Sequence, residues 1–227
     1  MSLGVAGTIG KSDQQVDALA SNDSAESWGL SGIVGYATGG LQAQAGVGYA
    51  WHDVDTSRTT RVGALGDRLN GRYDATTRQL FANLSYDIGA GAIDLAPFAS
   101  IANVRVTTGS FAETGGATAL SVARGSQDSS FLTLGADARV PLAATVSATL
   151  RGGWQHGWGD LAATSIARLP GSAAFRVDGI RLPQDAAILD AGVEAEVGPM
   201  RIGASYTGSY ASGWTQHGAR LTATVRF

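Results

Sequence analysis

The last seven residues, Leu221-Thr-Ala-Thr-Val-Arg-Phe227, alternate strictly between apolar and polar side chains. In an extended strand, one face would be purely apolar, formed by Leu221, Ala223, Val225 and Phe227. The other face would be polar and would carry Arg220 and Arg226. Such a strand belongs in a sheet whose two faces meet different surroundings. Alternation alone does not tell whether the apolar face meets a protein core or lipid.

The same period-two pattern recurs along the whole chain and predicts an all-β fold. We expect ten strands, at about residues 3–9, 27–36, 41–52, 79–86, 93–106, 131–140, 146–154, 187–197, 201–210 and 220–227. Short turns are expected at 39–40, 87–92, 141–145 and 198–199. Long loops are expected at 10–26, 53–73, 107–129 and 156–183, and a further loop around Trp214 and His217. Pro97 predicts an irregularity in the fifth strand, because proline cannot donate to a ladder.

The distribution of charge indicates which face meets lipid. No apolar face of the nine strands with clear phase carries a charge, and about half of its residues are Ala. Facing lipid at the bilayer midplane costs an Arg or Lys about 2–4 kcal/mol, whereas a soluble sandwich needs large core residues. We therefore predict an antiparallel up-and-down transmembrane β-barrel, one domain over residues 1–227. Its lumen would be lined by Asp137, Arg139, Arg151, Asp190, Glu194, Glu196, Arg201, Arg220 and Arg226.

Aromatic residues near the strand ends predict two interfacial girdles. These residues are Trp28, Tyr36, Tyr49, Trp51, Tyr86, Trp154 and Tyr210. The alternation of long loops and short turns, with an even number of strands, places both termini on the short-turn side. For a barrel of the bacterial outer membrane this side is the periplasm, and the long loops lie outside. Outer-membrane lipid is then the first partner.

Composition excludes several other classes. Charged residues make up 15% of the 227 residues, the net charge is -3 and Lys11 is the single lysine. This leaves no basic footprint for nucleic acid. With no cysteine, disulfides and thiolate zinc sites are excluded. No run approaches the roughly 20 apolar residues of a membrane-spanning helix, and no signal peptide is visible at Met1.

Several stretches together resemble the autotransporter β-domain, the translocator of type V secretion. They are Gly46–His52, Asp55–Arg58, Pro97–Ala99, Phe111–Gly116, Ala119–Val122, Ser130–Gly135, Tyr206–Gly208 and His217–Phe227. The terminal strand also resembles the assembly signal of bacterial outer-membrane barrels, formed here by Leu221, Ala223, Val225 and Phe227. The resemblance implies an outer-membrane barrel that passes a passenger polypeptide to the cell surface, and it implies the barrel-assembly machinery as a partner.

One departure from this family concerns the number of strands. Such domains typically have twelve strands and a linker helix inside the lumen, whereas this chain starts at the equivalent of the third strand. We expect either a fragment of a longer protein or ten strands that close into a narrower barrel.

Two other functions remain open from the sequence. His52 with Asp53 and Asp55, or His156 with Asp160, could act as a general-base pair in a barrel protease or lipid hydrolase. A small porin-like or adhesin barrel is the other alternative. Solvated rim residues explain these histidines more simply, so we predict no catalytic, cofactor-binding or metal-binding residue.

Overall fold

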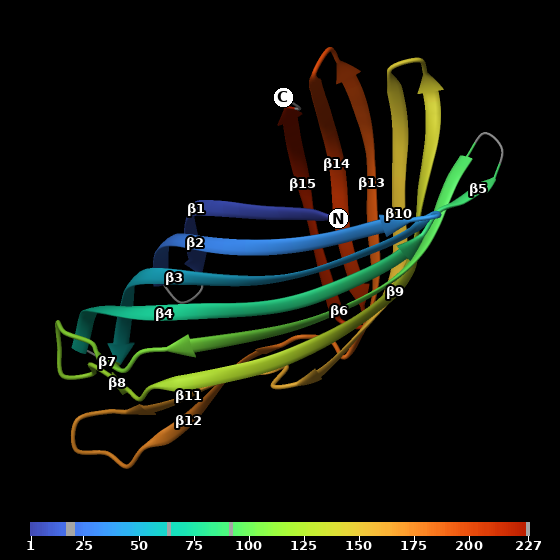
Figure 1. Ribbon diagram of the computed structural model, residues 1–227. Coiled ribbons are helices and arrows are strands. Elements are labelled where there is room, and N and C mark those ends of the chain that lie inside the picture. Colours follow the sequence, from blue (N-terminus) through green and yellow to red (C-terminus); the bar gives the residue numbers. More distant parts are fainter. Residues whose placement is uncertain (17–20, 63–64, 91–92, 226–227) are drawn as a thin grey trace.

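The computed structural model describes residues 1–16, 21–62, 65–90 and 93–225. In this part of the chain every regular element is a β-strand, and no helix is long and apolar enough to cross a membrane. Ten long strands form one antiparallel sheet that curls into a half-barrel (Figure 1). The predicted all-β, up-and-down architecture of about ten strands is confirmed.

The main sheet follows the order of the chain, with each strand paired to the next long one. Its strands are β1 (Ser2–Val16), β2 (Ser21–Thr38), β3 (Leu41–Val62), β4 (Leu65–Tyr86), β6 (Ile93–Thr108), β9 (Gly125–Ala143), β10 (Val146–Gly159), β13 (Asp185–Val197), β14 (Met200–Ala211) and β15 (Trp214–Val225). The short β5 (Ile88–Ala90) pairs with the start of β6. Strands β1 and β15 form the two edges, and they are not paired with each other among the described residues.

A second, four-stranded sheet lies at the end of the molecule that carries the long connections (Figure 1). It contains β7 (Phe111–Ala112), β8 (Ser121–Val122), β11 (Ala162–Arg168) and β12 (Phe175–Arg181), in the order β12-β11-β8-β7. The connection between β6 and β9 and the connection between β10 and β13 are therefore joined by backbone pairing.

The register shows that the strands are staggered as a barrel requires. A path of paired residues starts at Tyr36, near the end of β2, and passes through Ala43 on β3 and Leu84 on β4. It continues through Ala99, Leu134, Trp154 and Ala187 to Tyr210. The path begins near the short-turn end of one strand and finishes near the long-loop end of another. This climb is the shear that accompanies strand tilt in barrels.

Two local features follow directly from residue type. Gly39 and Gly40 have φ of 52° and 88°, which is what a two-residue type I′ hairpin turn needs. Pro97 lies in the gap between two ladders, since β4 pairs with β6 down to Phe98 and β5 pairs with β6 from Leu95. Its missing N–H therefore removes no ladder bond with β4 or β5.

The predicted lengths of several connections are wrong. Residues 53–62 and 65–73 form the upper halves of β3 and β4, paired from Asp53↔Asp74 to Val62↔Leu65. Much of 10–26 likewise belongs to β1 and β2, paired up to Val16↔Ser21. The expected loops at 107–129 and 156–183 contain β7, β8, β11 and β12 and the first residues of β9, and β15 already begins at Trp214. Backbone pairing continues above the apolar segments because a ladder in water needs no apolar face.

Candidate functional site

Eight of the nine predicted lumen residues lie within the described chain and share one face of five neighbouring strands. In the register, Arg151 lies between Asp137 on β9 and Asp190 on β13. The remaining members follow at even spacing along β9, β13, β14 and β15: Arg139, Glu194, Glu196, Arg201 and Arg220. Arg226 lies outside the described residues.

These side chains neutralise one another in pairs. Arg151 donates from Nε and Nη2 to the two carboxylate oxygens of Asp137, at 2.7 and 2.9 Å. Arg139 pairs with Glu194. Arg201 Nη2 lies 2.8 Å from Glu196 Oε1, and Arg220 Nη1 lies 3.8 Å from Asp190 Oδ2. The sequence predicted the shared face but not which charges would meet.

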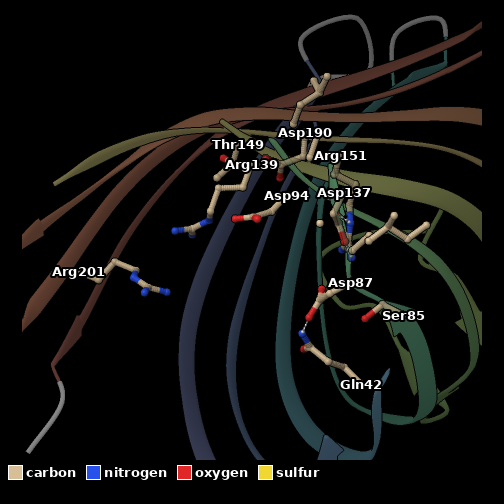
Figure 2. Close-up of a pocket in the computed structure, with 15 residues that line it drawn as sticks. Gln42, Ser85, Asp87, Asp94, Asp137, Arg139, Thr149, Arg151, Asp190 and Arg201 are labelled. Carbon is tan, nitrogen blue, oxygen red and sulfur yellow. Dashed lines mark hydrogen bonds and ion pairs between the residues drawn. The ribbon is translucent and has the colours of Figure 1, made fainter. Parts of the chain in front are cut away.

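The charged face lines a hollow of about 830 Å³ (Figure 2). The lining includes Gln42 on β3 and Arg201 on β14, which are six strand spacings apart in the sheet. In a flat sheet those strands would be roughly 29 Å apart. One hollow touches both because the sheet curls around this face, so the charged residues lie on its concave side.

The hollow combines both signs of charge with uncharged polar groups. Four carboxylates and three guanidinium groups line it, from Asp87, Asp94, Asp137 and Asp190 and from Arg139, Arg151 and Arg201. Gln42 Nε2 donates to Asp87 Oδ2 at 2.7 Å (Figure 2). The guanidinium carbon of Arg151 lies 4.3 Å from the ring centroid of Phe98. A hydrated surface with nearly equal positive and negative charge selects neither cations nor anions. It offers both hydrogen-bond donors and acceptors to a polar polypeptide.

A second polar cluster, which the sequence did not predict, lies where β3 and β4 extend beyond the hollow. Arg58 Nε and Nη2 donate to Glu113 Oε1 and Oε2, both at 2.6 Å. Glu113 also accepts the backbone N–H of Leu120 at 2.8 Å. Asp67 Oδ2 accepts from the backbone N–H and the hydroxyl of Thr118, at 3.1 and 2.8 Å. We call Arg58, Asp67, Glu113 and Thr118 the external clamp.

The external clamp fixes the β7–β8 connection over the inner face of the β3–β4 hairpin. Arg58 shares the face of Gln42, because both are even-numbered on an uninterrupted ladder. Phe111 stacks on Tyr73, with ring centroids 4.7 Å apart. A Cβ at Gly71 would lie 2.8 Å from the Phe111 ring, so glycine there permits the contact. The connection therefore covers the same inner face of the sheet as the hollow, but sixteen residues further along β3 than Gln42.

The hydrogen bonds of the external clamp lower the pKa values of its two carboxyl groups. The Glu113 side chain is 6% exposed. Desolvation raises the pKa of this carboxyl, but hydrogen bonds from Arg58 and Leu120 outweigh it and leave the pKa lowered. Hydrogen bonds from the Thr118 hydroxyl and backbone lower the pKa of Asp67. No sequence motif indicates the clamp, because its partners are separated by about 50 residues and meet only through the fold.

The structure assembles neither of the two histidine–carboxylate pairs that the sequence left open as an alternative. His52 Nδ1 lies 2.8 Å from Ser27 Oγ, and its Nε2 lies 2.9 Å from Thr77 Oγ1. Asp53 and Asp55 are on the opposite face of β3 by period two. Both ring nitrogens are thus taken by hydroxyls, with no carboxylate to orient the imidazole.

The other pair, of His156 with Asp160, is also absent. His156 Nδ1 instead lies 2.8 Å from Asp185 Oδ1, which also accepts from Trp154 Nε1 at 3.1 Å. Asp160 Oδ2 accepts the backbone N–H of Asp128. Within the described residues no group of three or more His, Cys, Asp or Glu could hold a metal ion.

The predicted girdle and terminal-strand residues lie on the outer face of the sheet. Trp28 stacks on Trp51 with ring centroids 4.0 Å apart, and Tyr49 lies 4.5 Å from Trp51. The hydroxyls of Tyr206 and Tyr210 are 2.6 Å apart. Further members of the girdle, Tyr36, Tyr86 and Trp154, are about half exposed. On β15, Leu221 and Val225 are exposed by 85% and 52%, Ala223 lies between them, and Phe227 falls outside the described residues.

Comparison with known proteins identifies the family to which this architecture corresponds. The family described as "Autotransporter beta-domain" matches residues 1–207. Two extracellular serine proteases of Serratia marcescens are 36% and 34% identical over 194 residues, covering 83% of this chain. The chain spans 19% of the length of each of these relatives. Among solved structures, the translocator domain of the autotransporter NalP from Neisseria meningitidis aligns with a TM-score of 0.80 and 16% identity, over 99% of this chain and 75% of that one.

Proposed function

Because the chain belongs to the autotransporter β-domain family, we propose that its role as an outer-membrane translocator consists in passing a passenger polypeptide through the hollow of its sheet. The observation that carries this proposal is the concave, charge-balanced wall built from β3 to β14. A polypeptide in transit presents N–H and C=O groups that need partners wherever water is limited. Paired Arg and carboxylate side chains can exchange partners with those groups without imposing one charge sign.

In this proposal the lumen is lined by the inner-face residues of the last five strands and their neighbours. They are Asp137, Arg139, Arg151, Asp190, Glu194, Glu196, Arg201 and Arg220, with Arg226 on the same alternation. The long connections face the outside of the cell and the termini face the periplasm. The girdle aromatics lie at the two lipid–water interfaces. The terminal residues Leu221, Ala223, Val225 and Phe227 present the strand that the barrel-assembly machinery recognises.

A cysteine cross-linking experiment tests whether the passenger travels along the inner face. The chain has no cysteine, so Thr149→Cys introduces a single thiol into the lining of the hollow. In the full-length protein, with a passenger stalled by a folded domain and carrying one cysteine, Thr149→Cys should form a disulfide to the passenger. Ala148→Cys is the matched control, since it is adjacent on β10 but points to the opposite face. Equal cross-linking at both positions, or cross-linking at position 148 alone, would contradict the proposal.

We further propose that this chain itself does not catalyse hydrolysis. The close contact of Ser27 with His52 lacks the acid that orients histidine in hydrolytic triads, since Thr77 holds the second ring nitrogen. Peptide and lipid hydrolysis by the isolated domain should therefore be unaffected by Ser27→Ala, His52→Ala and His156→Ala. A rate that falls in the Ser27 and His52 variants would identify an enzyme instead.

A further inference from the structure

Two arginines face each other on the outer wall of the half-barrel, outside the hollow. Arg78 on β4 and Arg105 on β6 are direct register partners, and both are exposed. Arg78 lies on the same face as Leu80, Leu84 and Tyr86, all of them exposed apolar residues of the outer wall. Directly opposed side chains in a sheet have Cβ atoms about 4.5–5.5 Å apart, and like charges there repel.

Neither arginine of this pair forms an ion pair in the described chain, although Asp128 lies next to Arg105 in the register. Among the described residues neither Arg78 nor Arg105 takes part in a salt bridge or side-chain hydrogen bond. Asp128, the register partner of Arg105 on β9, accepts from Asn103 Nδ2 at 2.6 Å. By contrast Arg72, six residues away on the same face of β4, is held by Asp55 at 2.8 Å. The two arginines and the neighbouring Asp128 therefore carry a net positive charge, and neither guanidinium has a hydrogen-bonded partner in the described chain.

The arginine pair lies at the height of the long-loop aromatic band. Arg78 is the register partner of Tyr49, and Tyr49 contacts Trp51. Eight residues separate Arg78 from Tyr86 of the short-turn band. At a strand tilt near 40° this separation corresponds to roughly 20 Å along the membrane normal, against an apolar band about 25 Å tall. The two Cα positions thus lie within roughly 5 Å of the upper edge of the apolar band, a distance that a long arginine side chain spans to bring its guanidinium to the headgroup region.

An apolar groove crosses the sheet below the arginines, lined by Met1 and by residues of β2, β3, β4, β6 and β9. Its volume is about 710 Å³, and its floor includes Ala43, Ala82 and Ala99, with Leu84 and Ile101 at its sides. Ala82 is the register partner of Ile101, and Leu84 is the partner of Ala99. The groove arises because alanines on three neighbouring strands lie between larger side chains. It begins four residues below the arginines, roughly 13 Å along the strand.

We propose that this outer wall binds one lipid of the external leaflet through a phosphate of its headgroup. Arg78 and Arg105 each direct charge-assisted hydrogen bonds to the phosphate oxygens, the geometry for which the guanidinium fork is suited. An acyl chain of the same lipid descends past Leu80 into the alanine-floored groove. A bound phosphate would offset the repulsion between the two arginines. The arginines would recognise the headgroup and the groove would recognise the acyl chain of one lipid molecule. The proposal rests on the outer-membrane placement of this face but not on passenger transport.

Lipid retention measured by native mass spectrometry tests the site on the full-length protein in detergent. Phosphatidic acid is the probe, phosphatidylcholine of the same acyl chains is the zwitterionic comparison, and inorganic phosphate is the headgroup alone. The double variant Arg78→Gln/Arg105→Gln should lose about tenfold or more in affinity for phosphatidic acid, since it exchanges charge-assisted hydrogen bonds for the weaker ones that a neutral amide donates. Phosphatidylcholine, whose phosphate charge is offset by its own choline cation, should bind the unchanged protein more weakly and lose less affinity in the double variant.

Two control variants separate the headgroup contribution from the chain contribution. Arg72→Gln removes an arginine of the same strand and face whose guanidinium is already occupied by Asp55, so its affinity should stay within about twofold. Ala82→Phe fills the groove and should weaken binding of phosphatidic acid without affecting the arginines. Unchanged affinity in the double variant overturns the site, and full displacement of the lipid by equimolar inorganic phosphate overturns the lipid assignment. Passenger cross-linking at Thr149→Cys should persist in the double variant, so failure of this inference and failure of the transport proposal are distinguishable.

Discussion

The lower and upper halves of the β3–β4 hairpin share one uninterrupted ladder but differ in their side chains. In the lower half, from Leu41↔Tyr86 to Val47↔Leu80, the outer face is apolar and most residues of the inner face are polar. In the upper half, from Asp53↔Asp74 upward, charged and hydroxyl residues occupy the outer face as well. Identical backbone pairing with different side-chain patterns shows that the surrounding medium dictates the pattern. The ladder itself forms in either medium.

A charge placed on the outer face should distinguish the two halves most strongly. Ala45 is exposed on the outer face of the lower half and lies midway between Tyr49 and Leu41, the register partner of Tyr86. Ala45→Arg should destabilise the folded barrel by about 2–4 kcal/mol, the cost of Arg at the lipid midplane. Thr59→Arg on the outer face of the upper half should change stability by no more than about 0.5 kcal/mol. Reversible unfolding in urea, in vesicles, measures both. Equal costs at the two positions would remove the distinction between lipid and water.

The inner face of the upper half should be sensitive to loss of the external clamp. Glu113→Ala leaves Arg58, which is 28% exposed, without its carboxylate partner, and it also removes the acceptor of the Leu120 N–H. We expect docking of residues 109–122 to weaken by about 1–3 kcal/mol, while the barrel strands stay intact. Hydrogen exchange of the β7–β8 connection, compared with exchange of β13 and β14, measures this effect. Faster exchange in β13 as well would mean that the clamp supports the whole sheet.

The sequence predicted the lower half of this hairpin well and the upper half poorly, for a physical reason. Lipid imposes apolar residues at every second position, so Ala43, Val47 and Leu84 identify their strands without any structure. Residues such as Asp55 and Arg72 pair equally well in water, where the ladder needs no such pattern. The expected loop at 53–73 was therefore wrong although the strands on both sides of it were right.

The candidate site shows the same division between local and long-range information. The alternation of side chains along each strand was enough to place Asp137, Arg151 and Asp190 on one face, because the face of a residue depends only on whether its position in the strand is odd or even. Which arginine meets which carboxylate depends on register and shear across several strands. The clamp between Arg58 and Glu113 depends on how a connection folds back over the sheet, and neither residue occurs in a motif that would indicate it.

Acidification should release the clamped connection and leave the lower half unchanged. The pKa of Glu113 is lowered in the folded protein, as is that of Asp67, so each ionised carboxylate stabilises docking. This contribution is complete above the unfolded-state pKa values, about 4.3 for Glu and 3.9 for Asp, and it is lost as the pH falls through the lower folded-state values. Protease cleavage within residues 109–122 should accelerate below about pH 4. A Glu113→Gln variant should be cleaved faster already at neutral pH and show a smaller change on acidification; a full-sized change in it would assign the effect to other groups.

The smallest effect should come from the ion pair on the outer face of the same upper half. Arg72 and Asp55 form two hydrogen bonds, at 2.8 and 2.9 Å, so their geometry matches that of the Arg58–Glu113 pair. Their side chains are 73% and 52% exposed, however, so water competes for both partners and salt screens them. Arg72→Gln should therefore have a much smaller effect than Glu113→Ala, measured as hydrogen exchange in the upper half of the β3–β4 hairpin in low and high salt. If it cost as much as Glu113→Ala, bidentate geometry rather than burial would govern the strength of these pairs, and the inner and outer faces of the upper half would be energetically equivalent.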